Sequence, residues 1–289
     1  MTTFVHTSPH KPGRIISEIL VLTAVLKKEW LHIIRYPSWV IQLIIWPLIF
    51  PAAYILTARA FAGPGQIALQ YFTEATGTQN YIGFIVVGTI VWMWQNIVLW
   101  DVGLTLRNEQ LRGTLESNWL SPSWRFSLLI GASLVQMITI ILFVTVTFLE
   151  YHFLFKVPFN GNFWVALLIF LSAIPAIYGI GITFASLVIR LKEANAFVYL
   201  VRGMVMVFCG VSYPVSILPG WMSSVSKWLP QTYLIRAIRS STLTDAGFLA
   251  VKADILILLA FGLFWMLCGY LTFNWMERLS RKSGVIGQY

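Results

Sequence analysis

The charged residues of this chain that are spaced for a defined chemistry are concentrated in residues 105–121, TLRNEQLRGTLESNWLS. Leu111 and Leu115, four residues apart, fall on one face of a helix that we predict over 105–120, and Gly113 interrupts it. Charged side chains flank this apolar ridge: Arg107, Glu109, Arg112 and Glu116. Ion-pairing groups around an apolar ridge favour docking into a groove of another protein. A plain solvated loop is the alternative, and it would not need the ridge.

Continuous apolar runs lie on both sides of this segment and make up most of the chain. Hydrophobic residues are 58% of the sequence, charged residues are 11%, and the mean hydropathy is +0.76. A bilayer-crossing helix needs about 20 apolar residues. Six windows of suitable length contain no Asp, Glu, Lys or Arg: 39–58, 81–100, 126–149, 163–189, 203–226 and 255–276. Because these runs do not alternate as barrel strands would, the sequence predicts an all-α membrane protein with six transmembrane helices.

The placement of Lys and Arg predicts the orientation of these helices. Six spans put both termini on one side, where segments 1–38, 101–125, 190–202 and 277–289 hold 14 of the 20 basic residues. The positive-inside rule therefore predicts a multi-pass protein of the inner (cytoplasmic) membrane with both termini in the cytoplasm. The polar N-terminus lacks the apolar core of a cleavable signal peptide. Since this topology accounts for the net charge of +9, we expect no nucleic-acid partner.

Residues 14–37 are predicted to form an amphipathic interface helix after a cytoplasmic tail, residues 1–13. Apolar residues, Trp30 among them, recur every three or four positions, whereas Lys27, Lys28 and Arg35 lie largely on other faces. A basic amphipathic helix of this kind lies in the membrane interface, in contact with lipids. It acts either as an anchor or as a lever towards a soluble partner. The six-span domain follows over 38–276, with a second cytoplasmic tail at 277–289.

A proline-rich region before the last span, residues 219–240, is expected to be re-entrant on the outer face. Pro214, Pro219 and Pro230 exclude one straight helix, and residues 203–218 are short for a full crossing. The remainder is too apolar for a free loop, because irregular backbone is not tolerated in hydrocarbon. We therefore expect a short span followed by two helices that dip back into the membrane, as lids or as an outer gate.

The sequence contains no residues suited to ATP binding, ion coupling or metal binding. There is no G-x-x-x-x-G-K-[ST] phosphate loop, so we expect this chain to bind no ATP by that mechanism. The six windows hold no carboxylate, His or Arg for a coupling ion, and Cys209 and Cys268 fit apolar packing. We predict no catalytic, cofactor-binding or metal-binding residues and an energy source outside the chain. A proton-coupled carrier and a non-transporting membrane scaffold stay open as alternatives.

Two motifs resemble those of the membrane permease of type-2 ABC exporters, and the resemblance covers essentially the whole chain. The family's R-x-E-x-x-x-G-T-L-E…S-P pattern is matched by Arg107, Glu109, Gly113, Thr114, Leu115, Glu116, Ser121 and Pro122. Its LPxW…PxTY signature before the last span is matched by Leu218-Pro219-Gly220-Trp221 and Pro230-Gln231-Thr232-Tyr233. Asn118-Trp119 departs from the Leu pair that is more usual in the family, and this departure can alter the choice of partner.

The resemblance implies a permease that is not catalytic by itself and works with two ABC ATPase subunits, which bind ATP and Mg. Two copies of the chain, or one copy with a paralogous permease, would form the pathway. The ATPase-coupling residues would be Leu106, Arg107, Glu109, Leu111, Arg112, Leu115 and Glu116, with Lys27, Lys28, Trp30 and Arg35 on the interface helix. The translocation path would include Trp92, Met93, Asn96, Met204 and Phe208, and the outer gate Tyr213, Pro214, Pro219, Trp221 and Tyr233.

The substrate is predicted from the composition of the spans. Helices without charges and rich in aromatic residues and Met favour outward export of an amphipathic drug-like or lipid-like molecule. Export of a lipid-linked polysaccharide of the O-antigen or teichoic-acid type is the alternative, because aromatic rings also stack on sugars.

Overall fold

The computed structural model describes residues 14–62, 67–120, 124–159, 161–188, 194–244 and 246–283, and all regular structure within these ranges is helical. The prediction of an all-α fold is therefore confirmed. The α-helices are α1 (Arg14–Arg35), α2 (Ser38–Ala62), α3 (Ile67–Thr76), α4 (Tyr81–Asp101), α5 (Thr105–Leu111), α6 (Leu115–Leu120), α7 (Ser127–Phe155), α8 (Phe163–Val188), α9 (Ala194–Phe208), α10 (Gly220–Ser226), α11 (Pro230–Leu243) and α12 (Phe248–Ser283). A 3-10 helix, η1 (Val215–Ile217), precedes α10.

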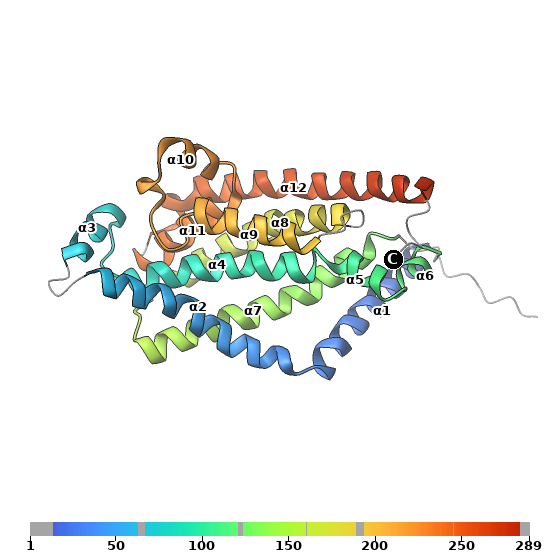
Figure 1. Ribbon diagram of the computed structural model, residues 1–289, viewed down its shortest axis with the longest axis horizontal. Coiled ribbons are helices and arrows are strands. Elements are labelled where there is room, and N and C mark those ends of the chain that lie inside the picture. The colour runs from blue at the N-terminus through green and yellow to red at the C-terminus, as the bar shows by residue number, and fades with distance from the viewer. Residues whose placement is uncertain are drawn as a thin grey trace, which may run out of the picture.

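The long helices run side by side and form a bundle with two distinct ends (Figure 1). α2, α4, α7, α8 and α12 are long and apolar enough to cross a membrane, and α9 is a shorter apolar helix. Helices α5 and α6 lie at one end, which we call the α5–α6 end, together with α1 and the C-terminal end of α12. The opposite end, with α3 and α10, is the α3–α10 end.

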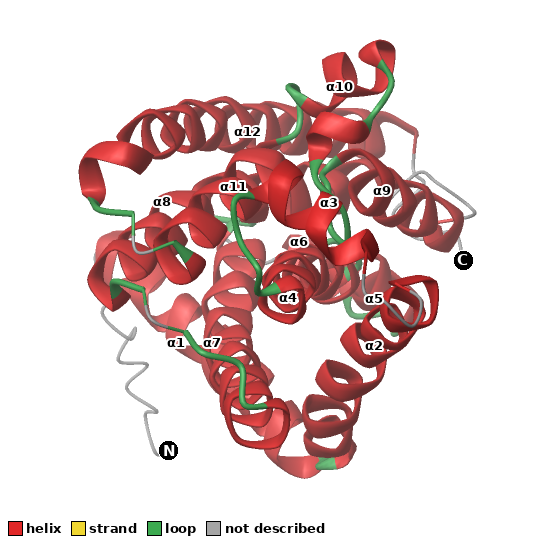
Figure 2. Cartoon of the chain, turned by 90° about the vertical axis from the view of Figure 1, so that its left-hand side faces the viewer, coloured by secondary structure: helices red, strands yellow, loops and turns green. Residues whose placement is uncertain are grey.

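The core of the bundle is built around α8, which packs along α12 and against α11. A Cβ at Gly179 of α8 would lie 2.7 Å from the Met266 nitrogen, so only glycine lets α12 come this close. Figure 2, viewed along the bundle from the α3–α10 end, shows α11 among α4, α8 and α12, with α2 at the periphery. The few buried residues of α2 agree with its peripheral place.

Prolines shape the α1–α2 corner and α2 itself. α1 ends at Arg35, and after Pro37 the chain continues directly into α2. Within α2, Pro51 has no N–H and leaves the Pro47 carbonyl without its usual helical donor. The Tyr151 hydroxyl of α7 donates a hydrogen bond to that carbonyl at 3.2 Å. A neighbouring helix thus supplies the donor that the proline lacks.

The fifth span was predicted as a short helix over 203–218, and these bounds are wrong. The apolar helix is α9, which begins at Ala194 and ends at Phe208, and its 15 residues are about 22 Å long. The chain then turns at Gly210, where φ is +68°. Arg202, which we assigned to a loop because of its charge, lies inside α9. The expectation that no Arg occurs within an apolar span therefore fails for this helix.

The region after α9 contains the expected two helices, α10 and α11. Pro230 begins α11, a position at which the missing N–H is harmless, and the buried face of α11 includes Gln231, Leu234 and Ile235. α10 contacts α9 and lies at the outside of the bundle. That these helices enter the membrane from the outer face stays a prediction.

The charged segment at 105–120 is two short helices rather than the single helix predicted. α5 ends where Gly113 adopts a left-handed conformation with φ +71°, and α6 begins at Leu115. The Thr114 nitrogen donates to the Glu109 carbonyl at 3.0 Å and closes the end of α5. Glycine at this turn therefore redirects the chain.

Candidate functional site

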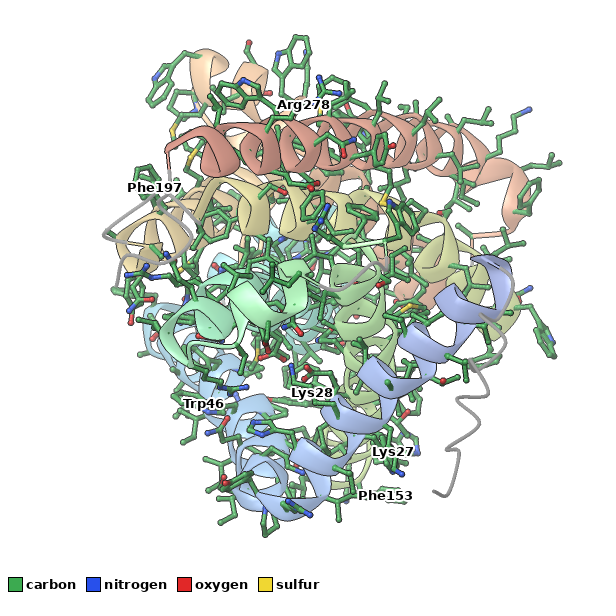
Figure 3. The ribbon with its side chains drawn as sticks, turned by 90° about the vertical axis from the view of Figure 1, so that its right-hand side faces the viewer. Lys27, Lys28, Trp46, Phe153, Phe197 and Arg278 are labelled. Atoms are coloured by element: carbon green, nitrogen blue, oxygen red, sulfur yellow. The ribbon has the colours of Figure 1, made fainter. Side chains whose placement is uncertain are left out.

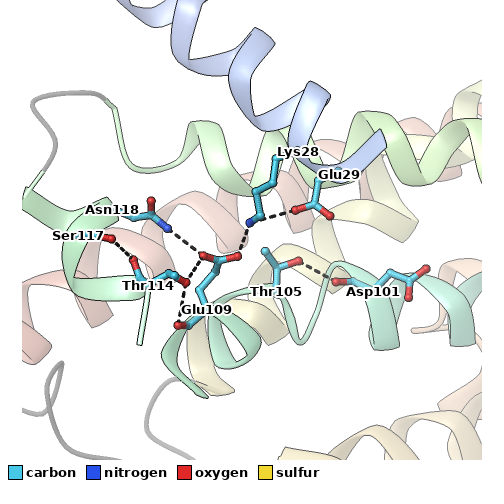
Figure 4. Close-up of polar contacts among 8 residues, drawn as sticks. All are labelled: Lys28, Glu29, Asp101, Thr105, Glu109, Thr114, Ser117 and Asn118. Atoms are coloured by element: carbon cyan, nitrogen blue, oxygen red, sulfur yellow. Dashed lines mark hydrogen bonds and ion pairs between the residues drawn. The ribbon is translucent and has the colours of Figure 1, made fainter. Parts of the chain in front are cut away.

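The centre of the α5–α6 end is a buried carboxylate, Glu109, which is 3% exposed. It accepts hydrogen bonds from the Lys28 ammonium, from the Thr114 hydroxyl at 2.6 Å and from the Asn118 amide at 2.9 Å (Figure 4). Glu109 thereby links three elements: α5, which carries it, α6 with Asn118, and α1 with Lys28. A buried charge satisfied in this way resists separation of its partners, because an unpaired carboxylate would be left behind.

α1 reaches Glu109 because it packs closely against α7. A Cβ at Gly131 of α7 would lie 2.4 Å from a methyl group of Val25, so a larger residue would push α1 away. Lys28 then faces α5 and α6, whereas Lys27 lies on the other, exposed side of α1 (Figure 3). A cavity of about 360 Å³ remains beside the ion pair, with Arg112 and Arg125 in its lining.

The coupling residues predicted from the sequence divide into buried and exposed groups. Leu111 is 60% exposed, but Leu115 is 1% exposed and Leu106 is fully buried. The predicted ridge is therefore wrong, because the turn at Gly113 points the two leucines in different directions. Arg112 is exposed, and Arg107 donates to Gln110 at 2.8 Å on α5 itself. The side chain of Glu116 lies outside the described residues.

One exposed apolar residue at this end was missed. Leu120, the last residue of α6, is 86% exposed. Together with Leu111 and Arg112 it forms what we call the docking surface: Leu111, Arg112 and Leu120. Its signal in the sequence is an apolar residue at the end of the predicted helix, just before Ser121-Pro122.

The interface helix has its basic and apolar groups largely on the surface of the chain. Lys27, Trp30 and Arg35 are exposed, as expected for a helix that contacts lipids. Val25, which is not part of the predicted apolar stripe, packs on α7 at Gly131, and Leu22 of that stripe lies beside it. The stripe was predicted to consist of Ile15, Ile19, Leu22, Leu26, Trp30 and Ile33. Contact of α1 with a membrane stays a prediction.

A second candidate site is a cavity of about 330 Å³ among α2, α4, α7 and α9, which we call the aromatic cavity. Its lining includes the rings of Trp39, Trp46, Phe50, Trp100 and Phe143, with Met93, Asn96, Asp101 and Arg202. Two of the predicted path residues, Met93 and Asn96, therefore line it. Met204 and Phe208 of α9 do not belong to the lining. This volume is in the range of small-molecule binding sites.

Arg202 is a charged residue of this cavity that the sequence analysis did not place there. Its guanidinium lies over the ring of Trp92, 4.5 Å from the centroid, and 5.6 Å from that of Phe50. The Trp92 indole donates to the Arg202 carbonyl at 3.1 Å and so fixes α4 against α9. Trp92, predicted as a path residue, is itself buried and presents its ring to the arginine.

The predicted outer-gate residues lie around the turn between α9 and α11. The Tyr213 hydroxyl donates to the Val207 carbonyl at 2.5 Å, and the Tyr233 hydroxyl donates to the Lys227 carbonyl at 3.0 Å. Trp221 is exposed and has its ring 6.1 Å from that of Phe208. Pro214 and Pro219 directly precede η1 and α10, in extended backbone. These contacts brace the turn, and a gating role stays a prediction.

The described residues contain no group of three or more His, Cys, Asp or Glu side chains placed to hold a metal ion. Cys209 is buried and Cys268 partly buried, and both are free thiols.

Comparison with protein families gives one match. A family model described as ABC-2 type transporter matches residues 21–243, well over half of the chain and including α2 to α11. No curated protein matches the sequence.

Proposed function

The chain belongs to the ABC-2 type transporter family, and we propose that it is the membrane permease subunit of an ATP-driven exporter, powered by a separate ATPase. The observation that carries this proposal is the Glu109 network at the α5–α6 end. It fastens α1, α5 and α6 into one unit, and it leaves Leu111, Arg112 and Leu120 facing outwards. An apolar and basic surface on a braced helix pair suits a soluble partner that must push on it.

The remaining parts of the proposal follow from this docking surface. The chain lies in the inner membrane. Its α5–α6 end and both termini are on the cytoplasmic side, because the ATPase needs cytoplasmic ATP. Two permease subunits, as a homodimer or with a paralogue, and two ATPases form the complex. ATP and Mg bind to the ATPases, and this chain supplies the path.

The aromatic cavity supports an amphipathic drug-like or lipid-like substrate. Its walls combine Trp46, Phe50 and Met93 with the polar groups of Asn96 and Arg202. A lipid-linked polysaccharide is the second candidate, since Trp39 and Trp100 also line the cavity and offer rings for stacking on sugars.

The experiment that tests the proposal is affinity purification of the tagged chain, co-expressed with its neighbouring genes, in mild detergent. We expect an ATPase to co-purify and Leu111→Asp to reduce its recovery at least about tenfold, because the substitution puts a charge into an apolar contact. Leu115 is unsuitable for this test, because it is buried and its substitution would disturb folding.

The matched control is Ile217→Asp, at a residue of similar exposure in η1. It should leave ATPase recovery unchanged. Recovery of the chain without any ATPase, or equal recovery with Leu111→Asp and the wild type, would refute the coupling role.

A further inference from the structure

Arg202 places a positive charge inside an apolar helix and forms no ion pair with any of the described residues. A charged residue at the centre of a membrane helix costs about 2.5–3.5 kcal/mol on insertion scales. Among the described residues, no ion pair or hydrogen bond is made by the Arg202 guanidinium, whose contacts are the rings of Trp92 and Phe50. Charged residues inside a membrane domain usually mark a substrate or ion pathway. The unpaired guanidinium therefore indicates a binding site for a ligand of opposite charge.

The Arg202 guanidinium lies over two rings whose planes are 67° apart, and it makes no hydrogen bond in the described part of the chain, so it can still bind an anion. A cation over an aromatic face uses the attraction of the ring for positive charge, not the N–H groups at the edge of the guanidinium plane. Those N–H groups form a planar fork that fits a carboxylate or a phosphate with two parallel hydrogen bonds. Trp92 and Phe50 therefore hold Arg202 in place without satisfying its donors.

The rest of the aromatic cavity suits the apolar body and polar head of one molecule. Trp46, Phe50 and Met93 provide an apolar wall. Asn96 lines the same cavity, and its buried side-chain oxygen has no hydrogen-bond partner in the described part of the chain. Because that oxygen is closed off from the cavity, the amide N–H2 group is the part of this partly exposed side chain that can donate to a ligand.

Asp101 and Arg202 both line the cavity, and no ion pair joins them in the described part of the chain, so the cavity has a negative and a positive wall. Asp101 is nine residues beyond Trp92 on α4, or about 13 Å along the helix. Asp101 ends α4 near the α5–α6 end, whereas Arg202 is stacked further into the bundle. An anion is therefore attracted to the Arg202 side and repelled from the Asp101 side.

We propose that the aromatic cavity binds an amphipathic molecule with an acidic head group, a phosphate or a carboxylate, and that Arg202 is the anion-binding residue. The apolar body of the ligand lies against Trp46, Phe50 and Met93. The binding site follows from the cavity itself, and only its use as a cargo site rests on the proposed export function.

The test measures binding to the purified chain alone, in nanodiscs of zwitterionic phospholipid, by titration calorimetry with empty nanodiscs subtracted. Three probes share one apolar body: octyl phosphate, octanol and octyltrimethylammonium. We expect octyl phosphate to bind at least about tenfold more tightly than octanol, and octyltrimethylammonium to bind most weakly. Equal affinities for octyl phosphate and octanol would overturn the proposal.

Variants of Arg202 locate the anion site. Arg202→Gln should remove the preference for octyl phosphate, and Arg202→Lys should keep part of it, because the charge stays and the fork is lost. Arg59→Gln is the matched control, since it removes an arginine at the far end of α2, outside the cavity, and should keep the preference. If Arg202→Gln does not fold, the single variants Arg202→Lys and Asn96→Leu take its place. Each of them should weaken octyl phosphate binding, and wild-type affinity in both would overturn the proposal.

Two further outcomes separate the possible origins of the ligand. If anionic phospholipid in the nanodisc competes with octyl phosphate, the site holds a membrane lipid; if octyl phosphate stimulates ATP hydrolysis by the complex, the site holds cargo. A change from dimer to monomer in Arg202→Gln would overturn the proposal, because the guanidinium would then serve a second copy. Failure to recover an ATPase would refute export and leave the binding result intact.

Discussion

Arg239 of α11 provides the sharpest test of how the α3–α10 end is held together. Its guanidinium donates to the Phe84 carbonyl from Nε at 3.1 Å and Nη2 at 2.8 Å, to the Gly210 carbonyl at 2.8 Å and to the Val211 carbonyl at 2.7 Å. It also lies over the Phe84 ring, 3.3 Å from the centroid. One side chain thus joins the start of α4, the turn after α9, and α11.

The expected magnitude follows from these contacts. Side-chain hydrogen bonds in helical membrane proteins average about 0.6 kcal/mol, which gives about 2 kcal/mol for four. Charged donors are worth more, about 1.5–3 kcal/mol per bond in soluble proteins, and the cation–π contact adds about 0.5–2 kcal/mol. Arg239→Ala should therefore lower the free energy of unfolding by about 3–5 kcal/mol, since three carbonyls also lose their donor.

The assay is equilibrium unfolding by SDS titration in mixed micelles, followed by circular dichroism. Lys252→Ala is the control, because it removes an exposed cation from α12 and should change the free energy by less than about 0.5 kcal/mol. The loss of unfolding free energy for Arg239→Lys should lie between those for Arg239→Ala and Lys252→Ala, because lysine keeps the charge and lacks the planar fork of the guanidinium. A loss of less than about 1 kcal/mol for Arg239→Ala would refute the reasoning.

Three further predictions use the same chain. A Cβ at Gly88 would lie 1.9 Å from the Val211 carbonyl oxygen, whereas one at Gly203 meets nothing within 4 Å. In SDS titration, Gly88→Ala should therefore lower the free energy of unfolding by at least about 2 kcal/mol, and Gly203→Ala should raise it by up to about 1 kcal/mol. If both substitutions changed the free energy of unfolding in the same direction, the packing described here would be contradicted. Lys28→Ala should cost about 1–3 kcal/mol, because the buried Glu109 carboxylate loses its cation and keeps only its Thr114 and Asn118 donors. Adding Glu109→Gln should recover at least half of that loss, and a smaller recovery would contradict this reason for it. Ser223→Cys, without the native cysteines, should react with a membrane-impermeant thiol reagent on intact cells, and reaction only after lysis would contradict the topology.

Hydropathy predicted the long helices well because a bilayer demands continuous apolar runs. α4 spans 81–101 against the predicted 81–100, and α8 spans 163–188 against 163–189. α12 extends beyond its predicted 255–276 at both ends, where charged residues begin. Its C-terminal extension is held by the ion pair of Arg125 with Glu277, whose closest atoms are 2.6 Å apart, and hydropathy contains no information on such pairs.

The burial of individual residues in 105–120 could not be predicted, because it depends on a distant segment. The sequence shows that Glu109 is near charged and apolar residues, but its closest cation, Lys28, is 81 residues away. Without that partner, Glu109 was assigned to the surface with Leu115. The family pattern identified the residues of this segment, and the packing of α1 on α7 decides which of them are accessible.

Arg202 was misplaced for a related reason. A charge in an apolar run is a sound boundary for a span when nothing compensates it. Here the rings of Trp92 and Phe50 do so, and they lie more than a hundred residues earlier in the chain. The error moved α9 by nine residues, and it also hid the charged group of the aromatic cavity.

The connection between α4 and α5 determines how a force at the docking surface would reach the aromatic cavity. Residues 102–104 between the two helices are buried, and a Cβ at Gly103 would lie 2.4 Å from the Leu99 carbonyl and 2.8 Å from the Phe184 ring of α8. A solvated loop would absorb a displacement of α5, but a close-packed turn has no room to do so. Movement of α5 would therefore shift α4 and α8 together, and with α4 the cavity wall that Met93 and Asn96 form.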